Sequence, residues 1–137
     1  MTIQQIQFED KKYLEKLVFF LEENEEGLKH FRYFKNRNLE CLKNHLSTFL
    51  FLEEEKTIGY GHLDREGDNV WLGIMVDKNY QGRGIGKKIM LFLIGFYDGD
   101  IKLSVDKENT KAFDLYIKVG FTIFEENERN YIMKLIR

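Results

Sequence analysis

A glycine-rich stretch in the second half of the chain decides the fold, and it reads Gln81-Gly82-Arg83-Gly84-Ile85-Gly86-Lys87-Lys88. An apolar run at 70–76 precedes it and predicts a buried strand, whereas apolar residues at helical spacing predict a helix over 84–96. A strand that leads through glycines into a helix offers an anion unpaired backbone N–H groups and the positive end of the helix dipole. The stretch therefore predicts a site for a phosphate-bearing ligand.

The composition predicts one folded domain over 1–137. The chain has 137 residues, enough for one hydrophobic core but too few for two ordinary domains, and 43% of them are hydrophobic. The net charge of −2 gives no reason to expect a nucleic-acid partner. Because Cys41 is the only cysteine, neither an intramolecular disulfide nor a cysteine-based metal site is expected.

The sequence also argues against a membrane location. The first ten residues lack the basic and apolar regions of a signal peptide, and no apolar run approaches the ~20 residues of a membrane-spanning helix. We therefore expect a cytoplasmic protein without a membrane partner, either a monomer or a homodimer.

Hydrophobic periodicity and turn residues predict the other elements. A strand at 3–8 and a helix capped by Asp10 begin the chain, and Leu39, Leu42 and Leu46 suggest a second amphipathic helix. The predicted elements that follow are strands at 48–52, 57–64 and 70–76, the 84–96 helix, a strand at 101–105, a helix at 109–119, and strands at 121–124 and 131–136.

This order, β-α-α-β-β-β-α-β-α-β-β, corresponds to an α/β (α+β) fold. It has a mixed, mostly antiparallel sheet of about six to seven strands and about four helices. Because the 84–96 helix is a crossover, the strands at 70–76 and 101–105 should be parallel.

Two common phosphate-binding motifs do not fit the glycine stretch. A dinucleotide-binding fingerprint requires G-x-G-x-x-G in an N-terminal βαβ unit, but here the third glycine comes one residue early and three antiparallel strands precede it. A P-loop requires a glycine at position 81 and a hydroxyl after Lys87, where the chain has Gln81 and Lys88.

The motif Gln81-x-x-Gly84-x-Gly86, preceded by Ile74-Met75-Val76, resembles the acyl-CoA-binding motif of the GNAT superfamily of N-acyltransferases. A second segment at 109–121 resembles that family's other signature, and the two motifs have the family's order and spacing. The resemblance implies a single GNAT-like domain that transfers an acetyl group from acetyl-CoA directly to a primary amine, without a metal.

The resemblance also implies the cofactor contacts. The CoA diphosphate would lie on the backbone N–H groups of 82–87, and the pantetheine arm would pair with 74–76 where this strand splays from the next. Backbone N–H groups near 73–75 would face the thioester oxygen, and a donor of this kind contributes about 3 kcal/mol to transition-state stabilisation. The implied cofactor-binding residues are Ile74, Met75, Val76, Gln81, Gly82, Arg83, Gly84, Ile85, Gly86, Lys87 and Asn109.

Tyr116 corresponds to the tyrosine beside the CoA sulfur and would act as the general acid, although an ordinary core aromatic fits the same position. The strand at 70–76 carries no acidic residue or histidine where the family often has its base. His62 and Asp64 on the neighbouring strand are the candidate bases. A hydrogen-bonded, half-buried histidine explains His62 equally well.

The acceptor is less constrained by the sequence. The aromatic and basic block at 31–37 loosely resembles bacterial GNAT proteins of amino-sugar metabolism, so that Arg32 or Arg37 could meet a nucleotide-sugar phosphate and Trp71 could line the acceptor site. Core packing with solvated charges explains the same block. A peptide or protein amine, a polyamine bound by the acidic run at 22–26, and a non-catalytic CoA-binding module are open alternatives to a small amino sugar.

Overall fold

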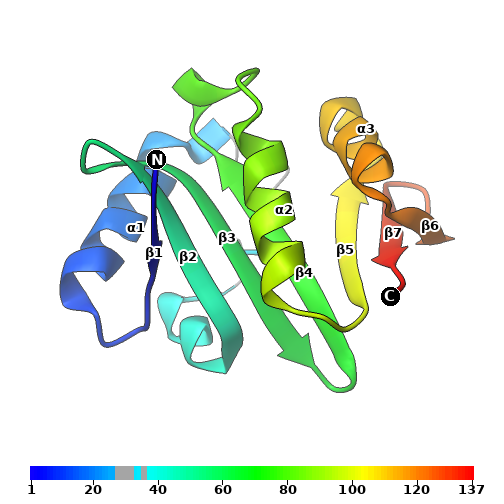
Figure 1. Cartoon of the computed structure of the whole chain (residues 1–137), viewed down its shortest axis with the longest axis horizontal. Coiled ribbons are helices and arrows are strands. Elements are labelled where there is room, and N and C mark those ends of the chain that lie inside the picture. Colours follow the sequence, from blue (N-terminus) through cyan, green and yellow to red (C-terminus); the bar gives the residue numbers. More distant parts are fainter. Residues whose placement is uncertain (27–32, 35–36) are drawn as a thin grey trace.

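The structure, a computed structural model, describes residues 1–26, 33–34 and 37–137. Seven strands form one sheet in the order β1-β2-β3-β4-β5-β7-β6 (Figure 1). The strands are β1 (Thr2–Gln5), β2 (His45–Glu53), β3 (Lys56–Glu66), β4 (Asn69–Val76), β5 (Ile101–Asp106), β6 (Thr122–Glu126) and β7 (Asn130–Leu135). The helices are α1 (Lys11–Glu23), α2 (Ile85–Phe96), α3 (Thr110–Val119) and the 3₁₀ helices η2 (Leu39–Asn44) and η3 (Lys78–Tyr80).

The predicted fold class and the parallel pairing of β4 with β5 are confirmed. The second amphipathic helix, predicted from Leu39, Leu42 and Leu46, is wrong in part. Its first six residues form the 3₁₀ helix η2, but β2 already begins at His45, which pairs with Asp64 of β3. Sheet pairing therefore overrides the helical spacing, and Leu46 lies at an irregularity of β2 with 39% of its surface exposed.

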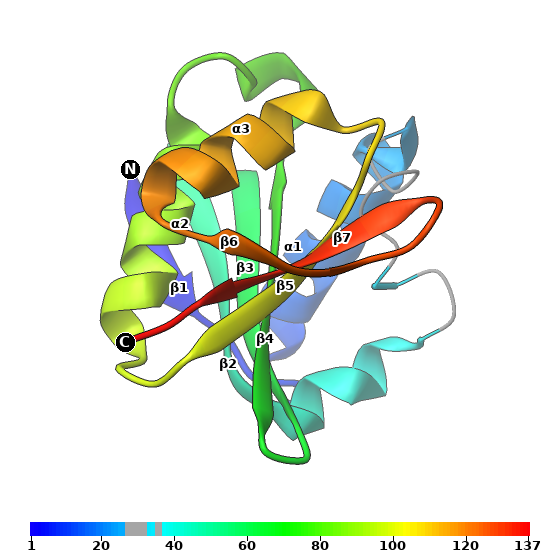
Figure 2. The same ribbon diagram turned by 90° about the vertical axis from the view of Figure 1, so that its right-hand side faces the viewer.

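The helices cover both faces of the sheet. Figure 2 shows α2 and α3 on one side and α1 on the other. The larger core lies between the sheet and α2 and includes Phe51, Ile89 and Leu93, whereas the smaller core beneath α1 includes Leu17 and Tyr60. The glycine turn and η3 lie at one end of this layered structure, between β4 and α2 (Figure 1).

Two glycines of β3 set the distance between the sheet and α2. A Cβ atom on Gly61 would lie 2.9 Å from Leu93 Cδ1 and 3.0 Å from Ile89 Cγ2, and one on Gly59 would lie 2.7 Å from Ile89 Cδ1. Because both helix side chains are fully buried, they have little room to move away. The glycines thus allow α2 to pack directly against the β3 backbone.

The sheet is nearly divided between β4 and β5. Strand β4 pairs with β3 along its whole length and β5 pairs with β7 in the same way, but a single register pair, Trp71 with Lys102, joins β4 to β5. Beyond that pair the two strands diverge toward the end where α2 begins (Figure 1). The predicted splay between the two strands is therefore present.

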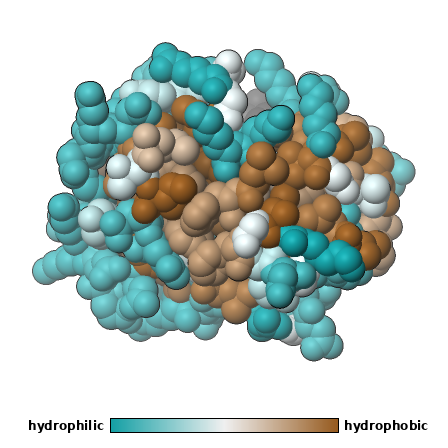
Figure 3. Space-filling model, viewed as in Figure 1, coloured by the Kyte–Doolittle hydropathy of each residue, from teal (hydrophilic) through white to brown (hydrophobic). Residues whose placement is uncertain are grey.

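Apolar side chains also reach the surface of the α2 face. Figure 3 shows them gathered over the middle of this face, and Leu91 and Phe96 of α2 are about half exposed, at 52% and 49%. Within the described ranges, no helix has the length and apolar character that a membrane crossing requires.

The substitution Gly61→Ala tests the close packing of β3 against α2. We expect it to lower the free energy of unfolding by about 1–3 kcal/mol, because the added methyl group overpacks the Ile89 and Leu93 side chains. The measurement is urea unfolding.

Gly95→Ala is the matched control, because a Cβ atom at this position of α2 meets no other atom within 4 Å. Alanine favours the helix over glycine, so this variant should be up to about 1 kcal/mol more stable than the parent. Equal stability of Gly61→Ala and the parent protein would contradict the packing argument.

Candidate functional site

A cavity of about 800 Å³ opens where β4 and β5 diverge. Its walls come from β3, β4, β5, the glycine turn, α3 and the start of β7. Residues at 73–76, which run along the separated part of β4, line it directly. The cavity therefore connects the predicted phosphate site with the polar face of β3.

The glycine turn forms one end of the cavity. Gly82 and Gly84 have φ angles of 78° and 77°, a left-handed conformation that side chains disfavour, and Gly84 is the N-cap of α2. Apart from the adjoining residues of the chain, no described atom lies within 4 Å of where a Cβ atom would stand on either glycine. The backbone of the turn is thus open to a ligand, and the first N–H groups of α2 have no helical partners. Lys87 lines the cavity beside them.

A buried polar clamp supports this turn. Asn24, just after α1, donates its side-chain N–H to Asp77 Oδ1 at 3.0 Å and accepts the backbone N–H of Lys78 at 2.7 Å. The other carboxylate oxygen of Asp77 accepts the backbone N–H of Asn79 at 3.0 Å. Asn24 and Asp77 are only 2% and 3% exposed. The end of α1 therefore fixes η3, which precedes the glycine turn.

Helix α3 contributes two of the predicted residues to the cavity. Asn109 is the N-cap of α3 and accepts the backbone N–H of Ala112 at 3.4 Å, so its capping role is confirmed. Tyr116 lines the cavity and is 8% exposed. Burial raises the pKa of the Tyr116 phenol well above its usual value, so the hydroxyl keeps its proton at neutral pH.

The other end of the cavity is polar. His62, Asp64 and Glu66 alternate along β3, so they share one face of the sheet and all three line the cavity. Trp71 of β4 pairs in register with Asp64 and also lines the cavity. Two carboxylates and an indole therefore stand together at this end.

Tyr33 and Arg37 close the same end from the segment before η2. Tyr33 donates its hydroxyl proton to Asp64 Oδ2 at 3.0 Å, and the hydroxyl also lies 2.6 Å from His45 Nε2. The Arg37 guanidinium lies over the Tyr33 ring, 4.4 Å from its centroid, and donates to the Tyr33 carbonyl at 3.0 Å. Both side chains line the cavity.

The two histidines of this region are held neutral. Burial, with a smaller contribution from the Arg37 charge, lowers the pKa of His45 to about 4. Burial, followed by the charges of His45 and Arg37, lowers the pKa of His62 well below its usual value. His62 is 2% exposed, and its Nδ1 lies 2.6 Å from the Tyr60 hydroxyl. His62 thus lines the cavity and is hydrogen-bonded, as both interpretations of the sequence expected, but it is buried rather than half-buried.

The structure brings nearly all predicted site residues to this cavity. All the cofactor-binding residues except Arg83 line it, as do Tyr116, His62, Asp64, Trp71 and Arg37. The Arg83 guanidinium instead lies over the Tyr80 ring, 4.8 Å from its centroid. Arg32 lies outside the described residues. Among the described side chains, no group of three His, Cys, Asp or Glu is arranged to hold a metal ion.

Several residues that line the cavity were not predicted from the sequence, among them Glu66, Ser104, Asp106, Lys111 and Asn130. Glu66 could have been found, because it continues the alternation of His62 and Asp64. The other positions depend on tertiary contacts, and Asn130 is the clearest example.

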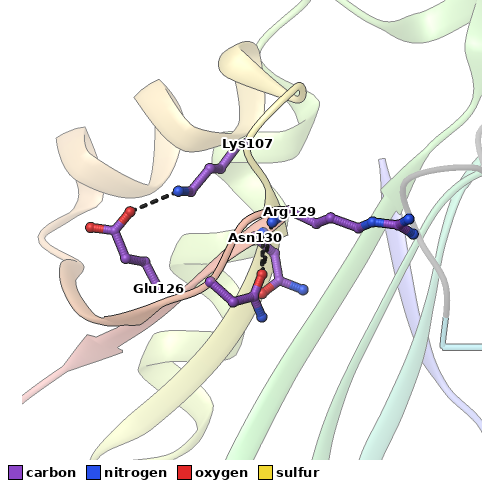
Figure 4. A network of polar contacts seen from close by, with 5 residues as sticks. Lys107, Glu126, Arg129 and Asn130 are labelled. Carbon is purple, nitrogen blue, oxygen red and sulfur yellow. Dashed lines mark hydrogen bonds and ion pairs between the residues drawn. The ribbon is translucent and has the colours of Figure 1, made fainter.

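Asn130 lines the cavity from the start of β7, and Figure 4 shows the β6–β7 hairpin to which it belongs. Asn127 Oδ1 accepts the backbone N–H groups of Arg129 and Asn130 at 2.8 and 2.9 Å, and Lys107 Nζ donates to Glu126 at 2.7 Å (Figure 4). Asn130 Oδ1 is buried and has no hydrogen-bond partner in the described part of the chain. A buried acceptor of this kind is suited to an N–H group of a ligand in the cavity.

Comparison with known proteins gives a consistent result. Residues 8–121 match the family model described as the acetyltransferase (GNAT) family. A curated relative from Bacillus subtilis subsp. natto (strain BEST195), named probable spermine N(1)-acetyltransferase, is 36% identical over 73 residues, 49% of this chain and 48% of that protein. The chain thus spans about half the length of this relative.

Solved structures show the same fold. The GNAT domain of S. lividans PAT superposes with a TM-score of 0.80 at 16% identity, over 97% of this chain and 88% of that one. The PaiA N-acetyltransferase from Thermoplasma acidophilum, solved in complex with coenzyme A, superposes with a TM-score of 0.74 at 17% identity, over 100% of both chains.

The neutral state of His45 predicts a pH dependence of stability. In the unfolded chain this histidine titrates near 6.5, but in the folded chain it titrates at about 4. Between these values the unfolded state binds more protons, so stability falls as the pH is lowered. From pH 7 to pH 4.5 we expect His45 to account for a loss of about 2.5 kcal/mol.

The variant His45→Gln isolates this contribution, because glutamine does not titrate. Urea unfolding at both pH values should show a smaller acid-induced loss for the variant than for the parent. Equal losses for the two proteins would show that His45 is not held neutral.

Proposed function

The chain belongs to the acetyltransferase (GNAT) family, and we propose that it transfers the acetyl group of acetyl-CoA to a primary amine bound beside Asp64 and Trp71. The observation that carries this proposal is one continuous cavity, which the glycine turn lines at one end and the β3 carboxylates line at the other. Donor and acceptor can therefore meet in it without a covalent enzyme intermediate.

The donor end suits the CoA diphosphate. The open backbone at Gly82 and Gly84 lets phosphate oxygens approach the first N–H groups of α2, and Lys87 adds a positive charge. The separated edge of β4 at 74–76 offers backbone groups to the pantetheine arm, as an added strand would use them.

Three groups would then share the chemistry. Asp64 accepts a proton from the ammonium form of the acceptor, because only the neutral amine has a lone pair for attack on the thioester carbonyl. Backbone N–H groups near Gly73 stabilise the oxyanion that forms. As the C–S bond breaks, Tyr116 gives its proton to the CoA thiolate. We assign the base role to Asp64 rather than His62, because Asp64 is partly exposed whereas His62 is only 2% exposed.

The charges at the Asp64 end support a cationic acceptor. Asp64 and Glu66 supply two carboxylates, and the face of Trp71 can bind a cation, so a small cationic amine such as a polyamine fits best. The name of the B. subtilis relative points to the same class. An amino sugar attached to a nucleotide is the second candidate, because Arg37 also lines the cavity.

The test is release of CoA thiol from acetyl-CoA with a panel of amines. The panel contains spermine, a nucleotide-linked amino sugar and a peptide with a free N-terminus. We expect spermine to give the highest kcat/KM. Faster release with the sugar nucleotide would reverse the acceptor assignment, and no acceleration by any amine would overturn the proposed function.

The variant Tyr116→Phe tests the general acid. We expect kcat to fall by about 10²-fold or more, with little change in the dissociation constant of acetyl-CoA, because phenylalanine fills the same space but has no proton to donate. Tyr131→Phe is the control, since Tyr131 does not line the cavity. A large loss of acetyl-CoA binding in Tyr116→Phe would contradict the acid role.

A further inference from the structure

Four polar side chains form a continuous hydrogen-bonded chain at the acceptor end of the cavity. Thr48 Oγ1 lies 2.7 Å from His45 Nδ1, and His45 Nε2 lies 2.6 Å from the Tyr33 hydroxyl. The Tyr33 hydroxyl in turn lies 3.0 Å from Asp64 Oδ2. The register of β2 with β3 pairs His45 with Asp64, and Tyr33 bridges them from the segment before η2.

The direction of each bond follows from the chemistry of its groups. A carboxylate in its base form can only accept, so Tyr33 must give its single hydroxyl proton to Asp64. His45 Nε2 must then be the donor to the Tyr33 oxygen. A neutral imidazole carries only one N–H, so His45 Nδ1 is an acceptor, and Thr48 donates its hydroxyl proton to it.

We propose that Tyr33 and His45 are positioning residues for the base, and that Thr48, His45 and Tyr33 together orient the Asp64 carboxylate through this one-way chain. The proposal rests on the base role given to Asp64 under the proposed function. Tyr33 holds Oδ2, and among the described residues no hydrogen bond to the other oxygen of Asp64 is found, so that oxygen accepts a proton from the acceptor. In that step an N–H bond of the ammonium group breaks, an O–H bond forms on Asp64, and the freed lone pair attacks the thioester carbonyl.

Burial and neighbouring groups keep Tyr33 and His45 in the protonation states that these hydrogen bonds require. Burial, then the neighbouring Cys41 and Asp64, raise the pKa of Tyr33 well above its usual value, so its hydroxyl proton is retained. The pKa of His45 is lowered to about 4, so the ring remains neutral at pH 7. His62 packs against Tyr33 with ring centroids 4.2 Å apart and limits the movement of the Tyr33 ring.

The tautomer of His45 tests the direction of the chain without any substrate. Long-range ¹H–¹⁵N spectra of the ¹⁵N-histidine-labelled protein should show His45 protonated on Nε2. In Asp64→Leu the Tyr33 hydroxyl loses its acceptor and can donate to His45, so the signal should change to the form protonated on Nδ1. Glu66→Leu, a change on the same strand and in the same cavity, should leave the tautomer unaltered.

Two results of these spectra would overturn the proposal. One is an Nδ1-protonated His45 in the parent protein, which needs no variant to be measured. The other is an Nε2-protonated His45 in folded Asp64→Leu, because the carboxylate would then not determine the tautomer.

Kinetics with spermine as the probe amine then test the positioning role. Tyr33→Phe should lower kcat by about tenfold and leave the dissociation constant of acetyl-CoA unchanged, whereas Tyr33→Phe added to Asp64→Asn should cause no further loss. His45→Gln retains an N–H donor for Tyr33 and should keep more activity than His45→Leu. Additive losses in the double variant would contradict action through Asp64.

Failure of the two proposals can be told apart. If no amine in the panel accelerates thiol release, the proposed function fails. The tautomer of His45 then still tests the direction of the hydrogen bonds that run from Thr48 to Asp64. If spermine is acetylated but Tyr33→Phe retains full kcat, the positioning role alone is overturned.

Discussion

The single backbone pairing between β4 and β5 is the constraint on which the rest of the structure depends. After Trp71 and Lys102 the two strands part, and both keep their full pairing with the strands on their other sides. The sheet therefore remains one folded unit while it opens at one end. The crossover through α2 brings a helix N-terminus to that same end, so anion-binding N–H groups and the opening coincide.

The two faces of strand β3 have different roles: one packs against α2 and the other lines the cavity. The two glycines on one face let Ile89 and Leu93 of α2 approach the backbone, whereas His62, Asp64 and Glu66 on the opposite face line the cavity. Since the side-chain period of a strand is two residues, a slip of one residue would exchange these faces and destroy both functions. The tight packing of α2 against the glycines therefore also fixes the register of the polar face.

Local sequence signals were sufficient for most of the fold and for the donor end of the site. Glycines, hydrophobic period and chain order identified the turn at 81–88 and the parallel strands, and the resemblance to the GNAT family implied the place of Tyr116, which lines the cavity. They failed where distant segments decide the outcome. His45 joins the sheet because Asp64 lies opposite it, which no helical spacing can reveal, and Asn24 reaches Asp77 across 53 positions of the sequence.

The acceptor end shows the same limit. Asp64 and His62 were found because they lie on a recognisable strand, but the contact of Tyr33 with His45 joins residues whose relation appears only in three dimensions. The position of Asn130, whose buried Oδ1 has no hydrogen-bond partner among the described residues, depends on a hairpin turn that Asn127 stabilises. Such contacts arise from packing rather than from any repeat in the sequence.

The opening between β4 and β5 also bears on aggregation. Unpaired strand edges invite pairing with other chains, and natural sheets protect them by keeping outer edges short or charged. Here the outer strands, β1 and β6, have only four and five residues, and β6 ends in two glutamates. The longer unpaired edges face each other across the opening inside the sheet. The backbone groups most prone to pair with a foreign strand are thus kept where a ligand can use them.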